Sequence, residues 1–103
     1  MTQHESSLIV ECGNLKIDPK KIEAKIDDER IRLSLLEFKL LKYFVDHRET
    51  VLSRHLILDS VWKDTVVGKR TVDTHVSCLR KKLRRFNGRF FTIYGAGYTL
   101  RGP

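Results

Sequence analysis

The stretch KRTVDTHVSCLRKKLRRF, residues 69–86, decides the fold because it combines a helical apolar period with seven positive charges. Its apolar residues recur every three or four positions, which is the spacing of one face of an α-helix. They are Val72, Val76, Leu79, Leu83 and Phe86. Such a narrow stripe is enough to dock a helix on a core. The pattern therefore predicts a helix over 69–86.

The opposite side of this helix carries long cations and short polar side chains. On a helical wheel it collects Arg70, Thr74, Ser77, Cys78, Lys81 and Arg85. A helix that enters the DNA major groove needs this combination, with cations for the phosphates and short side chains near the base edges. The alternative is an amphipathic helix whose cationic face is only solvated.

The positive charge of the chain is concentrated in its last third. The net charge is +7, but residues 1–68 hold 11 Lys or Arg against 12 Asp or Glu. Residues 69–103 hold nine Lys or Arg against the single Asp73. A field so localised favours a polyanionic partner, either nucleic acid or an anionic membrane surface. A basic surface kept for solubility is the alternative.

Length and composition indicate a single globular domain over residues 1–103. The chain is 41% hydrophobic and 32% charged, which is ordinary for a folded protein. It has no apolar run long enough to span a bilayer, and its start, MTQHESS, lacks a signal-peptide core. Cys12 and Cys78 lie 66 positions apart and are expected to be free thiols. We expect a cytoplasmic protein with no membrane partner.

Before the basic stretch, the first part of the chain reads as β-structure. Residues 8–33 consist of short segments with alternating apolar positions, such as Ile22, Ala24 and Ile26. The pairs Gly13-Asn14, Asp18-Pro19 and Asp27-Asp28 supply turn residues between them. This pattern predicts a small antiparallel sheet over 8–33.

Two more helices and a hairpin complete the predicted elements. Ser34 followed by Glu37 forms a capping box before a helix at about 35–47, and Ser53 begins a shorter helix at about 54–62. Two aromatic and β-branched segments joined by Gly95-Ala96-Gly97 predict a β-hairpin over 89–100. The fold class is therefore α+β. The order is that of a winged helix-turn-helix, with an N-terminal antiparallel sheet, a three-helix core and a C-terminal β-hairpin wing.

Four ordered segments also carry a family resemblance. They are LSLLEFKLLKYF, VLSRHLILDSVW, RTVDTHVSCLRKKL and TIYGAGYTL. In this order the chain resembles the effector domain of OmpR/PhoB-type response regulators, which are bacterial winged helix-turn-helix transcription factors. The resemblance covers nearly the whole chain and implies sequence-specific binding of double-stranded DNA.

The resemblance implies a role for each matching residue. Helix 69–86 would enter the major groove and wing 90–100 would touch the adjacent minor groove or backbone. Arg70 matches a phosphate-binding arginine. The other implied DNA contacts are Ser53, Arg54 and Trp62 around the second helix, Thr71, Thr74, His75, Ser77, Cys78, Lys81 and Arg85 in the third, and Thr92, Tyr94 and Tyr98 in the wing.

Two positions depart from the family pattern. Many members have arginine where this chain has Cys78, and cysteine cannot make a bidentate contact to guanine. The operator is therefore expected to differ from those of arginine-bearing relatives. Members commonly have arginine before the Gly-x-Gly of the wing, where this chain has Tyr94. Phosphate contact by the tyrosine hydroxyl is our replacement hypothesis.

The resemblance also implies partners and a missing domain. Because one recognition helix reads only a few base pairs, we expect a second copy on tandem or paired half-sites. The loop 63–68 matches a segment that contacts RNA polymerase in some members. These regulators carry a receiver domain, which this chain does not supply. Either the chain is the DNA-binding half of a longer regulator, or it works without phosphorylation control.

Other functions have less support in the sequence. A nuclease or hydrolase needs clustered carboxylates or a nucleophile with its base, and neither pattern is present, so no enzyme is expected. Nor do the histidines and cysteines have metal-ligand spacing, so we expect no metal or cofactor. A winged-helix protein-interaction module, with its basic face against an acidic partner, remains the alternative. Asp73 is expected to pair locally with Lys69 or Arg80.

Overall fold

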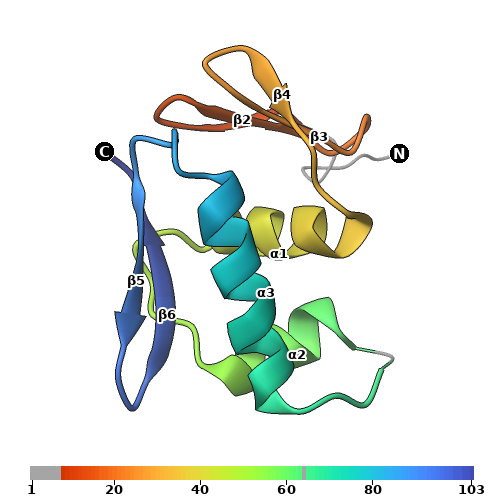
Figure 1. Cartoon of the computed structure of the whole chain (residues 1–103), viewed down its shortest axis with the longest axis vertical. Coiled ribbons are helices and arrows are strands. Elements are labelled where there is room, and N and C mark those ends of the chain that lie inside the picture. The colour runs from red at the N-terminus through yellow and green to blue at the C-terminus, as the bar shows by residue number, and fades with distance from the viewer. Residues whose placement is uncertain (1–7, 64) are drawn as a thin grey trace.

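The computed structural model describes residues 8–63 and 65–103, and it places a sheet, three helices and a hairpin in the expected order (Figure 1). The first sheet consists of β1 (Val10–Cys12), β2 (Leu15–Asp18), β3 (Glu23–Ile26) and β4 (Glu29–Ile31). The helices are α1 (Leu35–Asp46), α2 (Arg54–Val61) and α3 (Lys69–Lys82), and the hairpin is β5 (Arg89–Ile93) and β6 (Gly97–Arg101). The predicted winged-helix architecture is confirmed.

Tight turns set the register of the N-terminal sheet. Its strands are antiparallel in the order β1-β2-β3-β4. Gly13-Asn14 joins β1 to β2, and Asp27-Asp28 joins β3 to β4. Both aspartates have positive φ, 52° and 68°, which is the conformation that a two-residue hairpin turn requires. These turns are where the sequence predicted them.

The connection between β2 and β3 differs from the prediction. The Asp18 carboxylate accepts hydrogen bonds from the backbone N–H groups of Lys20 and Lys21, which forms a side-chain-stabilised turn. Ile22 lies in that turn with φ 53° and is exposed, so β3 begins at Glu23. The placement of Ile22 in the buried row of a strand was wrong.

Capping begins the first two helices where expected. Ser34 and Glu37 form the complete capping box of α1, and the Ser53 hydroxyl accepts the Leu56 N–H at the start of α2. Each helix ends one residue before its predicted end, because His47 and Trp62 are C-cap residues with non-helical dihedrals. Differences of this size are normal at helix termini.

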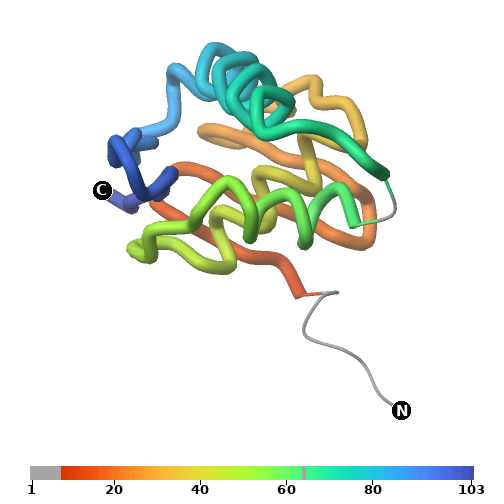
Figure 2. Tube along the Cα trace, turned by 90° about the horizontal axis from the view of Figure 1, so that it is seen from below, coloured from red at the N-terminus to blue at the C-terminus, as the bar shows by residue number. Residues whose placement is uncertain are grey.

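Helix α3 lies in the middle of the molecule, with its C-terminal end toward the N-terminal sheet (Figure 1). The N-terminal sheet lies at one end, the hairpin runs alongside α3, and α2 lies toward the other end (Figure 1). Figure 2 shows the hairpin on one side of α3 and the loop that leads into α3 on the other. One continuous core joins them, with fully buried side chains that include Leu15, Ile26, Phe44, Ile57, Leu79 and Leu100.

Helix α3 ends at Lys82, before the predicted end at Phe86. Leu83 is the C-cap, and the Phe86 N–H then bonds the Leu83 carbonyl, so a turn keeps both apolar side chains buried without further helix. The sheet holds this turn in place. Asn87 N–H donates to Asn14 Oδ1 and Asn14 N–H donates to Asn87 Oδ1, at 2.9 and 3.1 Å. Tertiary hydrogen bonds therefore replace the last helical turn.

An ion pair joins the first turn of α1 to the last residue of α3, and it makes the stability of the fold depend on pH. Glu37, which is buried, accepts a hydrogen bond from Lys82 Nζ at 2.7 Å. Burial alone would raise the pKa of Glu37, but the hydrogen bonds from Lys82 and from the Ser34 N–H outweigh it and lower the pKa. A lowered pKa stabilises the fold above the unfolded-state pKa, and this contribution is lost as the pH falls through the folded-state pKa.

Glu37→Gln is therefore expected to lower the free energy of unfolding at pH 7 by about 1 kcal/mol, a modest amount because Lys82 is partly solvated. The difference between variant and parent is expected to shrink as the pH falls below the ordinary glutamate pKa of about 4.3 and then through the lowered pKa of folded Glu37, where the carboxylate becomes protonated. Urea denaturation at pH 7 and at a pH below the folded-state pKa of Glu37 measures this difference. Glu11→Gln, a substitution of an exposed strand residue, is the control. An equal loss at both pH values would contradict the ion-pair explanation.

Candidate nucleic-acid interface

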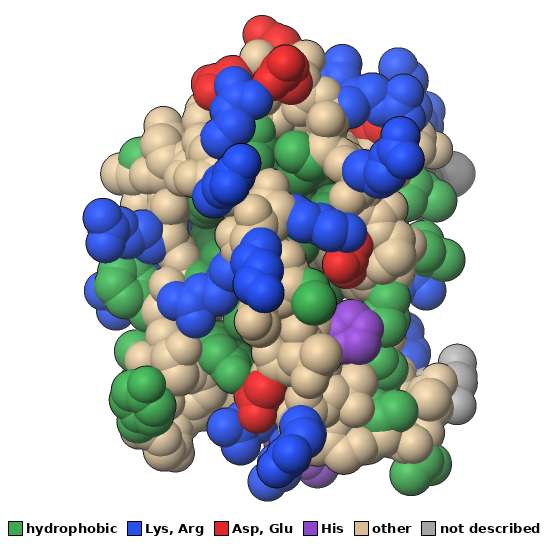
Figure 3. Space-filling view, viewed as in Figure 1, with side chains coloured by type: hydrophobic (Ala, Val, Ile, Leu, Met, Phe, Trp, Pro, Cys, Tyr) green, Lys and Arg blue, Asp and Glu red, His purple; other side chains and the backbone are tan. Residues whose placement is uncertain are grey.

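Helix α3 exposes a cationic face opposite its anchor. Val72, Val76 and Leu79 are buried against the core, as the apolar stripe predicted. The opposite face is exposed and carries Arg70, Thr74, Ser77, Cys78 and Lys81. Figure 3 shows Lys and Arg side chains along the length of α3 on this side of the molecule. The helix therefore presents its cations and its short polar groups together.

Arg85 does not belong to this face. It lies in the turn after α3, and its guanidinium pairs with the Glu29 carboxylate of β4. Its backbone carbonyl accepts a hydrogen bond from Asn14 Nδ2 at 3.0 Å. Because the helix ends early, Arg85 is drawn toward the N-terminal sheet, and its predicted place on the helical face was wrong.

The start of α2 lies beside the start of α3. The Ser53 hydroxyl is engaged as the N-cap of α2, and Arg54 follows as the first residue of that helix. Arg54 Nε lies 2.9 Å from Asp73 Oδ1 of α3, and the Arg54 side chain is about half exposed. The ion pair therefore leaves about half of the Arg54 side chain accessible to solvent.

Trp62 and His75 pack against each other. Their rings meet edge to face with centroids 5.2 Å apart. Trp62 is buried, whereas His75 is half-buried and its Nδ1 lies 2.9 Å from the carbonyl of Thr71, itself half-buried. Three predicted DNA contacts, Trp62, Thr71 and His75, thus make most of their contacts within the protein. Trp62 is mainly a core residue.

The one acid of the basic third has different partners from those expected. Asp73 pairs with neither Lys69 nor Arg80. Its Oδ1 accepts the Tyr98 hydroxyl at 2.5 Å and pairs with Arg54. Burial raises the pKa of the buried Tyr98 phenol, and its hydrogen bond to the Asp73 carboxylate raises that pKa further. One carboxylate thus contacts both α2 and the wing.

Arg80 ties the wing to α3 at a second level. Its Nη2 donates to the Phe90 carbonyl at 2.9 Å, and its Nη1 donates to the Thr92 hydroxyl at 3.2 Å. Thr92, a predicted DNA contact, is half-buried, and its hydroxyl is engaged by Arg80 within the protein. The wing is therefore fixed along the side of α3.

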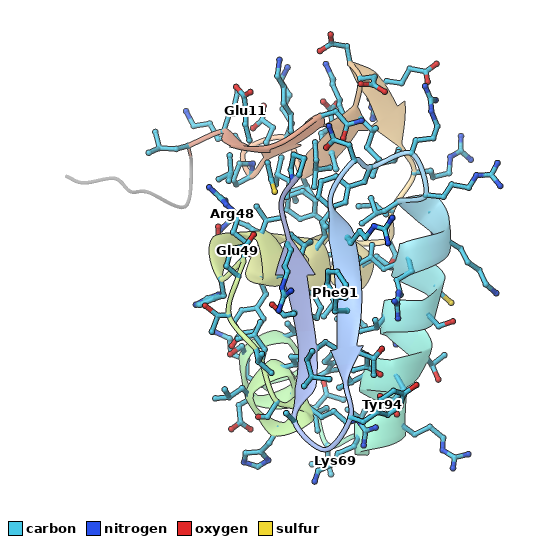
Figure 4. The ribbon with its side chains drawn as sticks, turned by 90° about the vertical axis from the view of Figure 1, so that its left-hand side faces the viewer. Glu11, Arg48, Glu49, Lys69, Phe91 and Tyr94 are labelled. Atoms are coloured by element: carbon cyan, nitrogen blue, oxygen red, sulfur yellow. The ribbon has the colours of Figure 1, made fainter. Side chains whose placement is uncertain are left out.

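The tip of the wing is open. Tyr94 is 93% exposed, so its ring and hydroxyl contact almost nothing in the protein. Figure 4 shows Tyr94 at the same end of the molecule as Lys69, the first residue of α3. A groove of about 390 Å³ separates the hairpin tip from the two helix starts, and its lining includes Arg54, Lys69, Asp73 and Tyr94.

Two cations of this surface were not among the predicted DNA contacts. Lys69 is exposed and lines the groove, and Arg80 holds the wing. Position at the start of the helix was a signal for Lys69. Nothing local identifies the target of Arg80, because its partners lie 10 and 12 residues away on a strand that packs there only in the folded state.

The loop before α3 is only partly described, because Asp64 of the 63–68 segment lies outside the described residues. Val66 in that segment is fully exposed. In residues 8–63 and 65–103, no group of three or more His, Cys, Asp or Glu is placed to hold a metal ion. None of the helices within those ranges has the length and apolarity to cross a membrane.

Comparisons with known proteins point in one direction. Residues 28–100 match the family described as "Transcriptional regulatory protein, C terminal". The phosphate regulon transcriptional regulatory protein PhoB of Rhizobium meliloti (strain 1021) is 37% identical over 97 residues, which cover 91% of this chain and 43% of that protein. The chain therefore spans less than half the length of this curated relative.

Solved structures agree with the fold. The Klebsiella pneumoniae RstA DNA-binding domain, crystallised in complex with the RstA box, superposes with a TM-score of 0.81 at 28% identity, over 95% of this chain and 98% of that one. The DNA-binding domain of CpxR from E. coli gives a TM-score of 0.82 at 31% identity, over 93% and 98%.

Proposed function

The chain belongs to the family of OmpR/PhoB-type response regulator C-terminal DNA-binding domains, and from this membership we propose that it binds double-stranded DNA sequence-specifically and regulates bacterial transcription. The observation that carries the proposal is the exposed face of α3, where cations and short polar side chains lie opposite a fully buried anchor. No catalytic step is part of the proposal. Its setting is the cytoplasm, where the chromosome is.

Within this proposal, α3 enters the major groove. Arg70 and Lys81 bind phosphates, while Thr74, Ser77 and Cys78 approach base edges. Short side chains at the closest approach let the helix sit deep in the groove, where base edges differ in their hydrogen-bonding pattern. Cys78 replaces a bidentate contact to guanine with a weak thiol contact, so the preferred site is proposed to lack that guanine.

The neighbouring elements supply backbone contacts. Ser53 and Arg54 are proposed to contact DNA phosphates from the start of α2. Lys69, which lines the same protein groove from the start of α3, is proposed to contact phosphates as well. The predicted contacts Trp62, Thr71, His75, Thr92 and Tyr98 are assigned mainly to holding these elements in place, since they are buried or half-buried. Arg85 lies outside the base-reading set because it is paired beyond the end of α3.

Tyr94 is the proposed contact of the wing tip. Its exposed hydroxyl has a clear path to a phosphate or to the minor groove, so Tyr94→Phe is expected to weaken DNA binding about five-fold, the value of one lost hydrogen bond. The fold is expected to be unaffected because the side chain is 93% exposed. Fluorescence anisotropy measures the affinity. Equal affinities for Tyr94→Phe and the parent would rule out the hydroxyl contact.

Two partners are proposed on family grounds. A second copy on a tandem or paired half-site supplies the specificity that a few base pairs cannot, since a genome offers many competing sites. The loop 63–68, in which Val66 is fully exposed, is proposed to face RNA polymerase.

Selection from a pool of promoter fragments tests the function. Duplexes retained by the protein at about 200 mM salt, where non-specific contacts are weak, are sequenced. We expect enrichment of one short site, in repeated copies. Retention without enrichment would reduce the proposal to non-specific binding. Competition by heparin but not by any duplex would favour the alternative, an interaction module for an acidic partner.

A further inference from the structure

Asp73 is the single acidic residue in residues 69–103, and it lies on the surface proposed to face DNA. A carboxylate there opposes phosphate binding, because like charges repel across the interface. Its contacts indicate what offsets this repulsion. Asp73 Oδ1 pairs with Arg54 Nε at 2.9 Å and accepts the Tyr98 hydroxyl at 2.5 Å.

The three residues come from the three elements that would meet DNA. Arg54 begins α2, Asp73 lies one turn into α3, and Tyr98 is the second residue of β6. The Tyr98 phenol is buried, whereas the Arg54 and Asp73 side chains are 47% and 36% exposed. The carboxylate thus joins a buried group of the wing to a partly open cation of the helix-turn-helix.

The backbone around Tyr98 makes this contact sensitive to position. Tyr98 exchanges both backbone hydrogen bonds with Leu52, at 2.7 and 2.9 Å, which places β6 directly beside the residue before the N-cap of α2. The wing, α2 and α3 therefore meet at one point. A shift of the wing tip relative to α3 has to break the bond between Tyr98 and Asp73.

We propose that Asp73 is a positioning residue for DNA recognition: it holds Arg54 in one orientation and fixes the wing against α3, and so raises discrimination between sites at the cost of total affinity. The inference rests on the proposed function. An arginine tethered at Nε presents its remaining donors in a fixed direction, whereas an untethered one neutralises whichever phosphate is near, regardless of sequence.

The test compares Asp73→Asn with Asp59→Asn. Asparagine keeps an acceptor for the Tyr98 hydroxyl but loses the charge that holds Arg54. Asp59 is an exposed acid of α2 that pairs with His55, so its replacement changes the net charge identically without touching the three residues. Affinity is measured for the most enriched duplex of the selection and for a shuffled duplex of the same length and composition.

Both variants are expected to bind the shuffled duplex more tightly, since each adds one positive charge. Only Asp73→Asn is expected to lower the ratio of the two affinities, by about ten-fold, the discrimination carried by one base pair. An unchanged ratio in Asp73→Asn, or an equal fall in both variants, would overturn the positioning role. A parent protein that binds both duplexes alike would instead remove the proposed function itself, and this inference with it.

Tyr98→Phe separates the two halves of the proposal and covers the case in which Asp73→Asn fails to fold. It removes the hydroxyl but keeps the pair between Asp73 and Arg54 and the net charge. The ratio is expected to fall by about three-fold with the shuffled-duplex affinity unchanged. An unchanged ratio would overturn the fixing of the wing. Circular dichroism and thermal unfolding of each variant show whether the fold is retained.

Discussion

Replacing Gly97 with alanine is expected to lower the free energy of unfolding by about 3 kcal/mol or more, since it adds backbone strain to a steric overlap. Gly97 has φ 141°, a conformation that residues with a side chain rarely adopt. A Cβ at this position would also overlap the backbone carbonyl of Leu52. The atoms that this Cβ would meet all belong to the backbone of Leu52 and Ser53, so no flexible side chain can move aside to make room.

The substitution is expected to detach the wing as well as destabilise the fold. Leu52 and Tyr98 exchange two backbone hydrogen bonds beside Gly97, and relief of the overlap has to separate them. Gly95→Ala is the matched control, since Gly95 has φ 84° but open space around its Cβ position. It is expected to cost about 1 kcal/mol from strain alone. Equal losses for both variants in urea denaturation would show that the close approach to Leu52 is unimportant.

Raising the salt concentration from 50 to 200 mM is expected to weaken DNA binding by about three decades, if about six phosphates are neutralised. Each neutralised phosphate releases condensed counterions, so the logarithm of the affinity falls linearly with the logarithm of the salt concentration. The exposed cations of α3 that lack an ion-pair partner among the described residues include Lys69, Arg70 and Lys81. Titrations at four or more salt concentrations give the slope.

Lys81→Ala connects the slope to one residue. Loss of one phosphate contact is expected to reduce the steepness of the slope by about 0.9. Lys20→Ala is the control: it removes the same charge from an exposed turn of the N-terminal sheet. Its slope is expected to match that of the parent. The same reduction in both variants would mean that net charge, not the face of α3, governs binding.

Local signals predicted most of the fold. The capping box at Ser34 and Glu37 began α1 where expected, and the positive φ values of Asp27 and Asp28 fit the turn that their sequence indicated. There were two errors, one caused by a tertiary contact and one by a local side-chain turn. Apolar spacing continued past Lys82, but hydrogen bonds between Asn14 and Asn87 replaced the last helical turn. Ile22 fitted an alternating pattern although the Asp18 carboxylate had already formed a turn there.

For the candidate site, the sequence predicted which residues share one face of α3, but not the contacts that these residues make with other elements. Helical period placed Thr74, Ser77 and Lys81 together because residues three to four apart share a side of a helix. It gave no access to the partners of Asp73, which lie 19 and 25 residues away along the chain. Asp73 has cations near it on its own helix, such as Lys69, with which it could have paired. The choice between those and a distant arginine is made by how the helices pack.

The paired amides of Asn14 and Asn87 also bear on the order in which the chain folds. They lie 73 positions apart, so their contact closes most of the chain into a loop. Closing a long loop costs conformational entropy before any contact offsets it, and distant pairings form slowly for that reason. The helices and the C-terminal hairpin are built from nearer contacts. We therefore expect the N-terminal sheet to dock last during folding and to be the first part released when the domain opens.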